Sequence, residues 1–180
     1  MMKVRAGRPV VRSSRGLVTS PHVLASQAGA EVLKEGGSAI DAAVSASAVL
    51  SVVYPHMTGI GGDAFWLIYD AKARVVRYVD GGGRAAASGT LHAFAQRGLA
   101  EVPYRGPLPG TLTVPGSVAS WTLAHAAYGR LPLKHCLERA IGHAHEGFAV
   151  GERLAHWREL ARTELAKCPE ATALFLRMPW

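Results

Sequence analysis

The sequence contains little cysteine, no long apolar run and no start typical of a secretory signal. Its two cysteines, Cys136 and Cys168, lie far apart and outside any C-x-x-C motif, so they support neither a disulfide framework nor a cysteine zinc site. Ser, Gly or charged residues interrupt each apolar run well before the ~20 residues that cross a bilayer. The N-terminal segment lacks the apolar stretch of a signal peptide. We therefore expect no membrane segment and a cytoplasmic location.

Acidic residues are also few: 13 Asp and Glu face 20 Lys and Arg, which gives a net charge of +7. Five basic residues precede the first acidic residue, Glu31; they are Lys3, Arg5, Arg8, Arg12 and Arg15. The rest of the chain is close to balanced, so no basic groove is indicated. We interpret residues 1–15 as a solvated basic arm and residues 16–180 as the single remaining domain, and we expect no nucleic-acid partner.

The signals for helices and strands predict a helix-rich α/β (α+β) fold. A hydrophobic content of 49% against 18% charged residues argues against disorder. Helices are predicted from Ser20-Pro21 to Gly36-Gly37 and over residues 38–53, 90–98, 117–128, 132–146 and 150–167. Strands are predicted over residues 16–19, 64–69 and 74–79, the last two forming a hairpin, and residues 103–116 read as a Pro/Gly-rich surface loop. An isolated hairpin is only marginally stable, so we expect the rest of the sheet to come from elsewhere.

The stretch Gly59-Ile60-Gly61-Gly62-Asp63-Ala64 fits the dinucleotide-binding pattern G-x-G-x-x-A. In that motif a strand precedes the glycines, and a helix follows whose amides face the phosphates. Here the order is reversed: a predicted helix with a Ser38 to Asp41 capping-box spacing comes before, and a predicted hairpin comes after. The glycines therefore indicate a tight helix-to-strand turn, and no nucleotide is expected.

Eight histidines raise the question of a metal site, chiefly through His143-Ala144-His145-Glu146. Two residues spaced i, i+2 on a helix point to different faces, unlike the i, i+4 histidine pair of a zinc protease. The sequence therefore predicts no metal and no other cofactor.

The order of motifs resembles the N-terminal large-subunit region of γ-glutamyltranspeptidases and their cephalosporin-acylase-like relatives. The matching segments are "SPHVLASQAG" at residues 20–29, "GGSAIDAAV" at 36–44, "TGIGGD" at 58–63 before an aromatic strand, and "VPGSVASWTLAHAAYGRLPL" from residue 114. The similarity runs from about Gly16 to the end of the chain.

The resemblance implies an N-terminal-nucleophile hydrolase, a four-layer αββα sandwich made from a precursor that cuts itself into large and small subunits. In such an enzyme the new N-terminal Thr of the small subunit attacks a γ-glutamyl amide, for example that of glutathione, and water or an amine then resolves the ester. This chain would be the helix-rich large-subunit part. It has no Thr in the processing motif, so it holds no catalytic residue and is expected to be inactive without the small subunit.

Arg84 is the candidate substrate-binding residue, as the group that would grip the substrate's α-carboxylate. The family's common form is D-x-R-E-x-A-P, whereas here three glycines separate Asp80 from Arg84 and the Glu is absent. This glycine-rich form is similar to the acylase-like branch, which leaves the acyl donor open. The alternative is that Arg84 is a surface or structural ion-pair residue.

Two further hypotheses for the whole chain stay open. In the first, the chain is a non-catalytic fragment of such an enzyme, which would expose apolar faces meant for the missing half. In the second, it is a protein whose basic arm binds anionic surfaces or nucleic acid. Salt-sensitive binding that depends on residues 1–15 would indicate the second.

Overall fold

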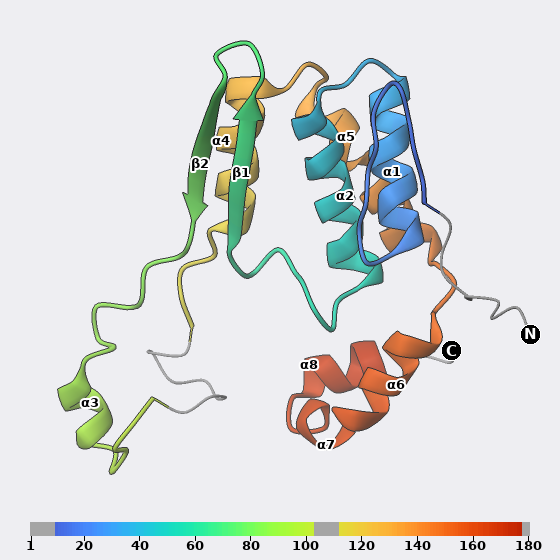
Figure 1. The fold of residues 1–180 in the computed structure, drawn as a ribbon. Helices are drawn as coiled ribbons and strands as arrows, with labels where there is room; N and C mark the ends of the chain where they lie inside the picture. Colours follow the sequence, from blue (N-terminus) through green and yellow to red (C-terminus); the bar gives the residue numbers. More distant parts are fainter. Residues whose placement is uncertain (1–9, 103–111, 178–180) are drawn as a thin grey trace, which may run out of the picture.

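The computed structural model describes residues 10–102 and 112–177, which form helices around one antiparallel hairpin (Figure 1). Residues 1–9 of the predicted basic arm and 103–111 of the predicted surface loop lie outside this part. The main elements are α1 (Val23–Lys34), α2 (Ala39–Val53), β1 (Ala64–Asp70), β2 (Val75–Gly81), α3 (Leu91–Ala95), α4 (Ser117–Tyr128), α5 (Leu133–Glu146) and α6 (Glu152–Leu160). Three short helical segments follow: α7 (Arg162–Leu165), α8 (Pro169–Ala171) and a π-helical turn, η1 (Thr172–Leu176).

Helices α1 and α2 pack against each other across the short Gly36-Gly37 connection. They approach closely because the facing residues are small: a Cβ added to Gly29 would lie 2.9 Å from the Ala42 carbonyl oxygen. Gly36 ends α1 with φ of 94°, a left-handed conformation that glycine adopts without strain. The predicted capping box then opens α2, because Ser38 Oγ accepts from Asp41 N and Asp41 Oδ2 accepts from Ser38 N.

Two expectations for the N-terminal part are wrong. Residues 16–19 form no strand. The N-cap of α1 is His22, whose Nδ1 accepts from Leu24 N, rather than Ser20 followed by Pro21. The Ser20 hydroxyl instead donates to the His22 carbonyl oxygen at 2.7 Å and lies 2.8 Å from Ser26 Oγ, so it stabilises the turn before the helix. A third expectation is also corrected, because the helix predicted over 150–167 breaks at Ala161 into α6 and α7.

The hairpin is confirmed, and it has two different faces. Strand β1 pairs antiparallel with β2 from Ala64 opposite Gly81 to Asp70 opposite Val75. Trp66 and Ile68 are buried against the helices. Trp66 Nε1 donates at 3.0 Å to Ser120 Oγ on α4, and Ser120 Oγ donates to the Ser117 carbonyl oxygen. This buried chain of hydrogen bonds fixes the hairpin to α4.

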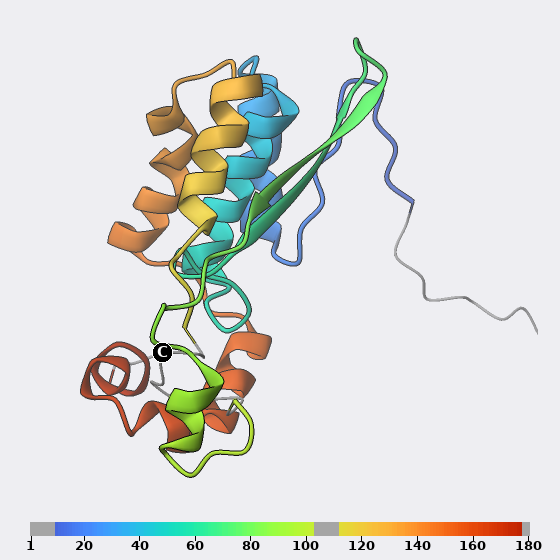
Figure 2. The same ribbon diagram turned by 90° about the vertical axis from the view of Figure 1, so that its left-hand side faces the viewer.

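The helices and the hairpin form two layers (Figure 2). Helix α2 lies at the centre of the core, in contact with α1, α4 and α5, and the hairpin packs on α4. Both α3 and the segment from α6 to η1 lie beyond one end of these layers (Figures 1 and 2). None of the described helices is long and apolar enough to span a membrane.

Candidate functional site

Arg84 lies just after β2, where the chain leaves the sheet through three consecutive glycines. Its side chain is exposed, and within residues 10–102 and 112–177 its guanidinium has no hydrogen bond or ion pair. Its backbone is held, since Val114 N donates to the Arg84 carbonyl oxygen at 3.0 Å and Ala85 forms an antiparallel bridge with Thr113. The structure thus combines a fixed main chain with a free cationic side chain. That combination suits the binding of an anion.

The glycines beside Arg84 are required by close backbone contacts. A Cβ on Gly83 would lie 1.9 Å from the Val114 carbonyl oxygen, and one on Gly81 would lie 2.3 Å from the Ala64 carbonyl oxygen. A Cβ on Gly116, the N-cap of α4, would lie 2.2 Å from the Gly81 carbonyl oxygen. Three chain segments therefore meet here main chain to main chain, which no larger residue would allow.

One glycine of the G-x-G-x-x-A stretch, Gly62, takes part in the same junction. As predicted, a helix precedes the stretch and a strand follows. The carbonyl oxygen of Gly62 accepts hydrogen bonds from Gly116 N at 3.1 Å and Ser117 N at 2.9 Å. These amides at the start of α4 are the kind that bind phosphate in nucleotide sites, and here they are occupied by the protein's own main chain.

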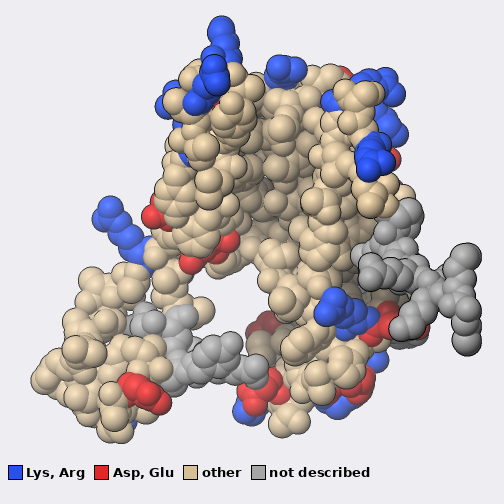
Figure 3. Space-filling model, viewed as in Figure 1, with Lys and Arg blue, Asp and Glu red and all other residues tan. Residues whose placement is uncertain are grey.

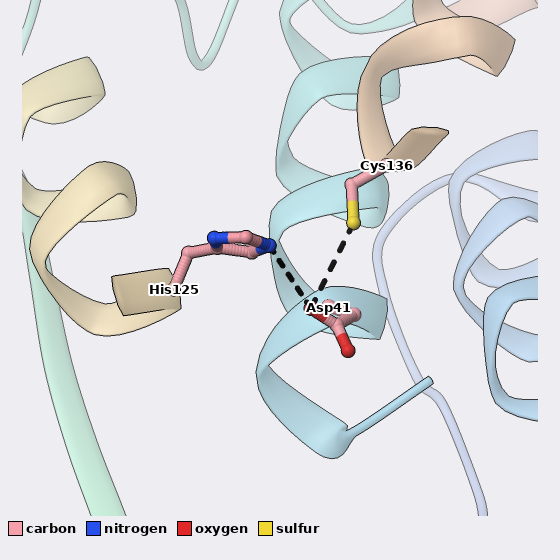
Figure 4. A group of neighbouring side chains, drawn as sticks. All are labelled: Asp41, His125 and Cys136. Carbon is pink, nitrogen blue, oxygen red and sulfur yellow. Dashed lines mark hydrogen bonds and ion pairs between the residues drawn. The ribbon is translucent and has the colours of Figure 1, made fainter. Parts of the chain in front are cut away.

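A second polar cluster lies inside the helical core and joins three helices (Figure 4). Asp41 on α2 is fully buried. Its Oδ1 lies 3.3 Å from His125 Nε2 on α4 and 3.8 Å from Cys136 Sγ on α5. Its Oδ2 accepts from three backbone amides: Ser38 N at 2.7 Å, Arg130 N at 2.9 Å and Leu131 N at 3.3 Å. Burial by itself raises the pKa of Asp41, but these amide hydrogen bonds outweigh it and lower the pKa.

The ligand atoms of Asp41, His125 and Cys136 lie within 4.8 Å of one another, close enough to hold a metal ion. Their protonation argues for a structural role instead. His125 Nε2 lies 2.8 Å from the Leu131 carbonyl oxygen, so it must carry the proton, and a protonated nitrogen has no lone pair for a metal. Burial raises the pKa of the Cys136 thiol to about 11, so it donates to Asp41 as a neutral thiol. We read the cluster as a tie between α2 and the α4–α5 turn.

His143 and His145, the sequence's strongest metal candidates, do not belong to this cluster. Both lie in the last turn of α5, where His145 is exposed and His143 is partly buried. Beyond the capping box, the Asp41 cluster has no signal in the sequence, because His125 and Cys136 reach Asp41 only through the tertiary fold.

Arg84 and the Asp41 cluster both lie in the part of the chain that matches known proteins. The family model described as Gamma-glutamyltranspeptidase matches residues 25–179. The chain belongs to the gamma-glutamyltranspeptidase family. The gamma-glutamyltranspeptidase of Helicobacter pylori superposes on it with a TM-score of 0.84 at 34% identity, covering 92% of this chain and 47% of that chain. The helix-rich architecture with its small antiparallel sheet thus matches part of a gamma-glutamyltranspeptidase structure.

Two curated relatives extend the family comparison. The chain is 42% identical over 167 residues to the Glutathione hydrolase-like YwrD proenzyme of Bacillus subtilis, covering 93% of this chain and 31% of the relative. It is 43% identical over 149 residues to the Oxamate amidohydrolase proenzyme of Klebsiella pneumoniae, covering 80% of this chain and 28% of the relative. The chain therefore spans less than a third of the length of either relative.

Proposed function

We propose that this chain is the N-terminal part of the large subunit of an N-terminal-nucleophile hydrolase. The enzyme cleaves or transfers a γ-glutamyl or related amide, such as that of glutathione, through a Thr nucleophile on a small subunit outside these 180 residues. Family membership supports the reaction class, and the relatives' description as proenzymes is consistent with maturation by cleavage. The observation that carries the proposal is Arg84, whose exposed guanidinium has no partner among the described residues 10–102 and 112–177 and whose main chain is held.

Arg84 would contribute binding and orientation rather than bond cleavage. A guanidinium donates two parallel hydrogen bonds to a carboxylate, and each charge-assisted bond contributes about 1.5 to 3 kcal/mol. Because the Arg84 main chain is already held by Val114 and Thr113, substrate binding needs to order only the Arg84 side chain and not its backbone. The carboxylate of the substrate would then fix the position of the scissile amide against the nucleophile.

The outer face of the hairpin supports the proposal of a four-layer αββα sandwich. Five apolar or aromatic side chains on this face are 59% to 79% exposed: Phe65, Leu67, Tyr69, Val76 and Tyr78. Figure 3 shows this face largely free of charged groups along the middle of the strands, with basic side chains near the hairpin turn. A continuous apolar sheet face of this kind is typical of a surface covered by another element, and we propose that a second sheet of the complete enzyme packs there.

Two relatives suggest different acyl donors with one shared chemical feature. One is named a glutathione hydrolase-like protein and the other an oxamate amidohydrolase. Glutathione carries an α-carboxylate on its γ-glutamyl group, and oxamate carries a carboxylate next to its amide. Either anion suits Arg84, so our proposal specifies a carboxylate-bearing amide.

The test uses the complete enzyme and compares γ-glutamyl anilide with an analogue that lacks the α-carboxylate. Arg84→Ala should lower kcat/KM for the anilide by roughly one to two orders of magnitude for each lost hydrogen bond, and change the analogue little. Arg77→Ala, another exposed arginine of the hairpin, serves as the control and should leave both rates near wild type.

Three outcomes would contradict the proposal. Equal loss on both substrates removes Arg84 from the substrate site. Turnover of the anilide by purified residues 1–180 alone contradicts the placement of the nucleophile outside this chain. If the complete gene product has no amidase activity at all, the hypothesis of a non-catalytic fragment is favoured instead.

A further inference from the structure

Asp63 makes a contact that the proposed role of Arg84 does not include. It lies immediately before β1, and its Oδ1 accepts a hydrogen bond from Gly83 N at 2.8 Å across 20 residues of sequence. Gly83 directly precedes Arg84. The Asp63 carboxylate therefore joins the entry of one strand to the exit of the other, on the residue next to the candidate substrate-binding arginine.

Gly83 also lies against the segment that leads into α4. The space where a Gly83 Cβ would lie is filled by the Val114 carbonyl oxygen at 1.9 Å and by Thr113 Cβ at 2.9 Å. The next peptide is held as well, because Val114 N donates to the Arg84 carbonyl oxygen. Gly83 is thus held by Asp63, just before β1, and by residues 113–114.

A second carboxylate holds the neighbouring amide, but only locally. Asp80 Oδ1 accepts from Gly82 N at 2.8 Å, two residues along the same chain. Such a bond shapes the turn without tying it to another element. Of the two carboxylates, only Asp63 connects the loop to a different strand, so it should have the larger effect on where Arg84 lies.

We infer that Asp63 is a positioning residue for substrate binding: its carboxylate fixes the Gly82–Arg84 loop so that the Arg84 guanidinium meets the substrate carboxylate in one orientation. This inference rests on the proposed function and deepens it. Val114 and Thr113 hold the residues that follow Gly83, whereas the bond from Asp63 limits the glycines that precede Arg84, and glycine has the greatest backbone freedom. Geometry held by supporting hydrogen bonds is what a bidentate contact requires.

The experiment measures kcat and KM of the complete enzyme with γ-glutamyl anilide and with its analogue lacking the α-carboxylate. Asp63→Ala should raise KM for the anilide about tenfold, as expected for one lost orienting contact, with kcat and the analogue changed less than about threefold. Asp63→Asn keeps an oxygen that can accept from Gly83 N and should stay close to wild type. Asp80→Ala, the matched control, should have a smaller effect than Asp63→Ala.

The double variant Asp63→Ala with Arg84→Ala decides whether the two residues act together. If Asp63 acts through Arg84, the double variant should be no worse on the anilide than Arg84→Ala alone. Additive losses, equal losses on both substrates, or an Asp63→Ala variant within twofold of wild type would overturn the inference. A wild-type enzyme that does not distinguish the two substrates would instead contradict the proposed function itself, so the two failures can be told apart.

Discussion

The helical core and the hairpin region are each held together by polar contacts, but the contacts differ: a buried side chain makes them in the core, and the main chain makes them at the end of the hairpin. In the core, one buried side chain, Asp41, reaches three backbone amides and ties α2 to the α4–α5 turn. Around Arg84, at the end of the hairpin, the close contacts run main chain to main chain through Gly81, Gly83 and Gly116, and the Arg84 side chain is exposed. The difference suggests a division of labour: a buried network stabilises the core, while a backbone junction leaves Arg84 free for a ligand.

The largest effect is expected from Asp41→Asn, which attacks the core. If the oxygen of the new asparagine side chain faces the three backbone amides, its NH2 group faces the Nε2–H of His125 and the thiol of Cys136, and both of these groups are donors. If the asparagine side chain is turned the other way, its NH2 group faces the backbone N–H groups of Ser38, Arg130 and Leu131, which are donors too. Breaking a buried charged network costs roughly 3 to 5 kcal/mol, and we expect a loss of this size in the free energy of unfolding, measured by urea denaturation.

Asp70→Asn provides the control for Asp41→Asn. Asp70 also accepts from two backbone amides, Lys72 N and Ala73 N, but in the hairpin turn, where it is only partly buried. Its substitution should cost less than about 1 kcal/mol. Similar losses for both variants would show that burial of the Asp41 network does not set its contribution.

The next effect is expected from Gly81→Ala, which attacks the backbone junction. The new Cβ would lie 2.3 Å from the Ala64 carbonyl oxygen and 2.5 Å from Ser120 Cβ, so the hairpin must shift away from α4. Overpacking of this kind costs about 1 to 3 kcal/mol. In addition to urea denaturation, near-UV circular dichroism should report the change around Trp66, which is bonded to Ser120.

Gly61→Ala is the matched glycine variant, because a Cβ at Gly61 would meet open space. Its stability should remain within about 1 kcal/mol of wild type. A Gly81→Ala protein as stable as Gly61→Ala would mean that the hairpin does not dock through this close approach, and would break the proposed contrast between the two regions.

The features that the sequence predicted well are those encoded locally. The Ser38 and Asp41 capping box, the end of α1 at Gly36-Gly37 and the reversed order of elements around Gly59 to Gly62 each depend on a few neighbouring residues. The N-cap of α1 was missed because Ser20 and Pro21 form a plausible start, yet the Ser20 hydroxyl bonds to His22 and Ser26 instead.

The long-range contacts could not be read from the sequence. The bond from Cys136 to Asp41 spans 95 residues and the bond from Gly83 to Asp63 spans 20, and no periodicity records such pairs. Arg84 was found because three glycines precede it and the motif order resembles a known family. Its role in binding substrate remains a prediction, while its exposure and its fixed backbone are what the structure adds.

The smallest effect is expected on the solvent face of the helical core, where charge pairs join α1 and α5. His135 Nε2 lies 2.6 Å from Glu35 Oε2, and Arg139 also bonds to Glu35. The hydrogen bond to Glu35 raises the pKa of His135 above its ordinary 6.5, with the nearby Glu138 adding to the rise. Because the folded-state pKa is the higher one, the stabilisation is fully present below about pH 6.5 and is lost as the pH rises through the raised pKa.

His135→Gln should therefore be less stable than wild type near pH 5.5 and equal to it near pH 9, with a small difference because both partners are exposed to solvent. The measurement is the free energy of unfolding of both proteins across this range. Glu35→Gln in the wild-type and His135→Gln backgrounds completes a double-mutant cycle, in which the coupling between the two residues should vanish at high pH. A coupling that grows with pH would reverse the sign of this argument, and would mean that neutral His135, rather than its protonated form, holds α1 to α5.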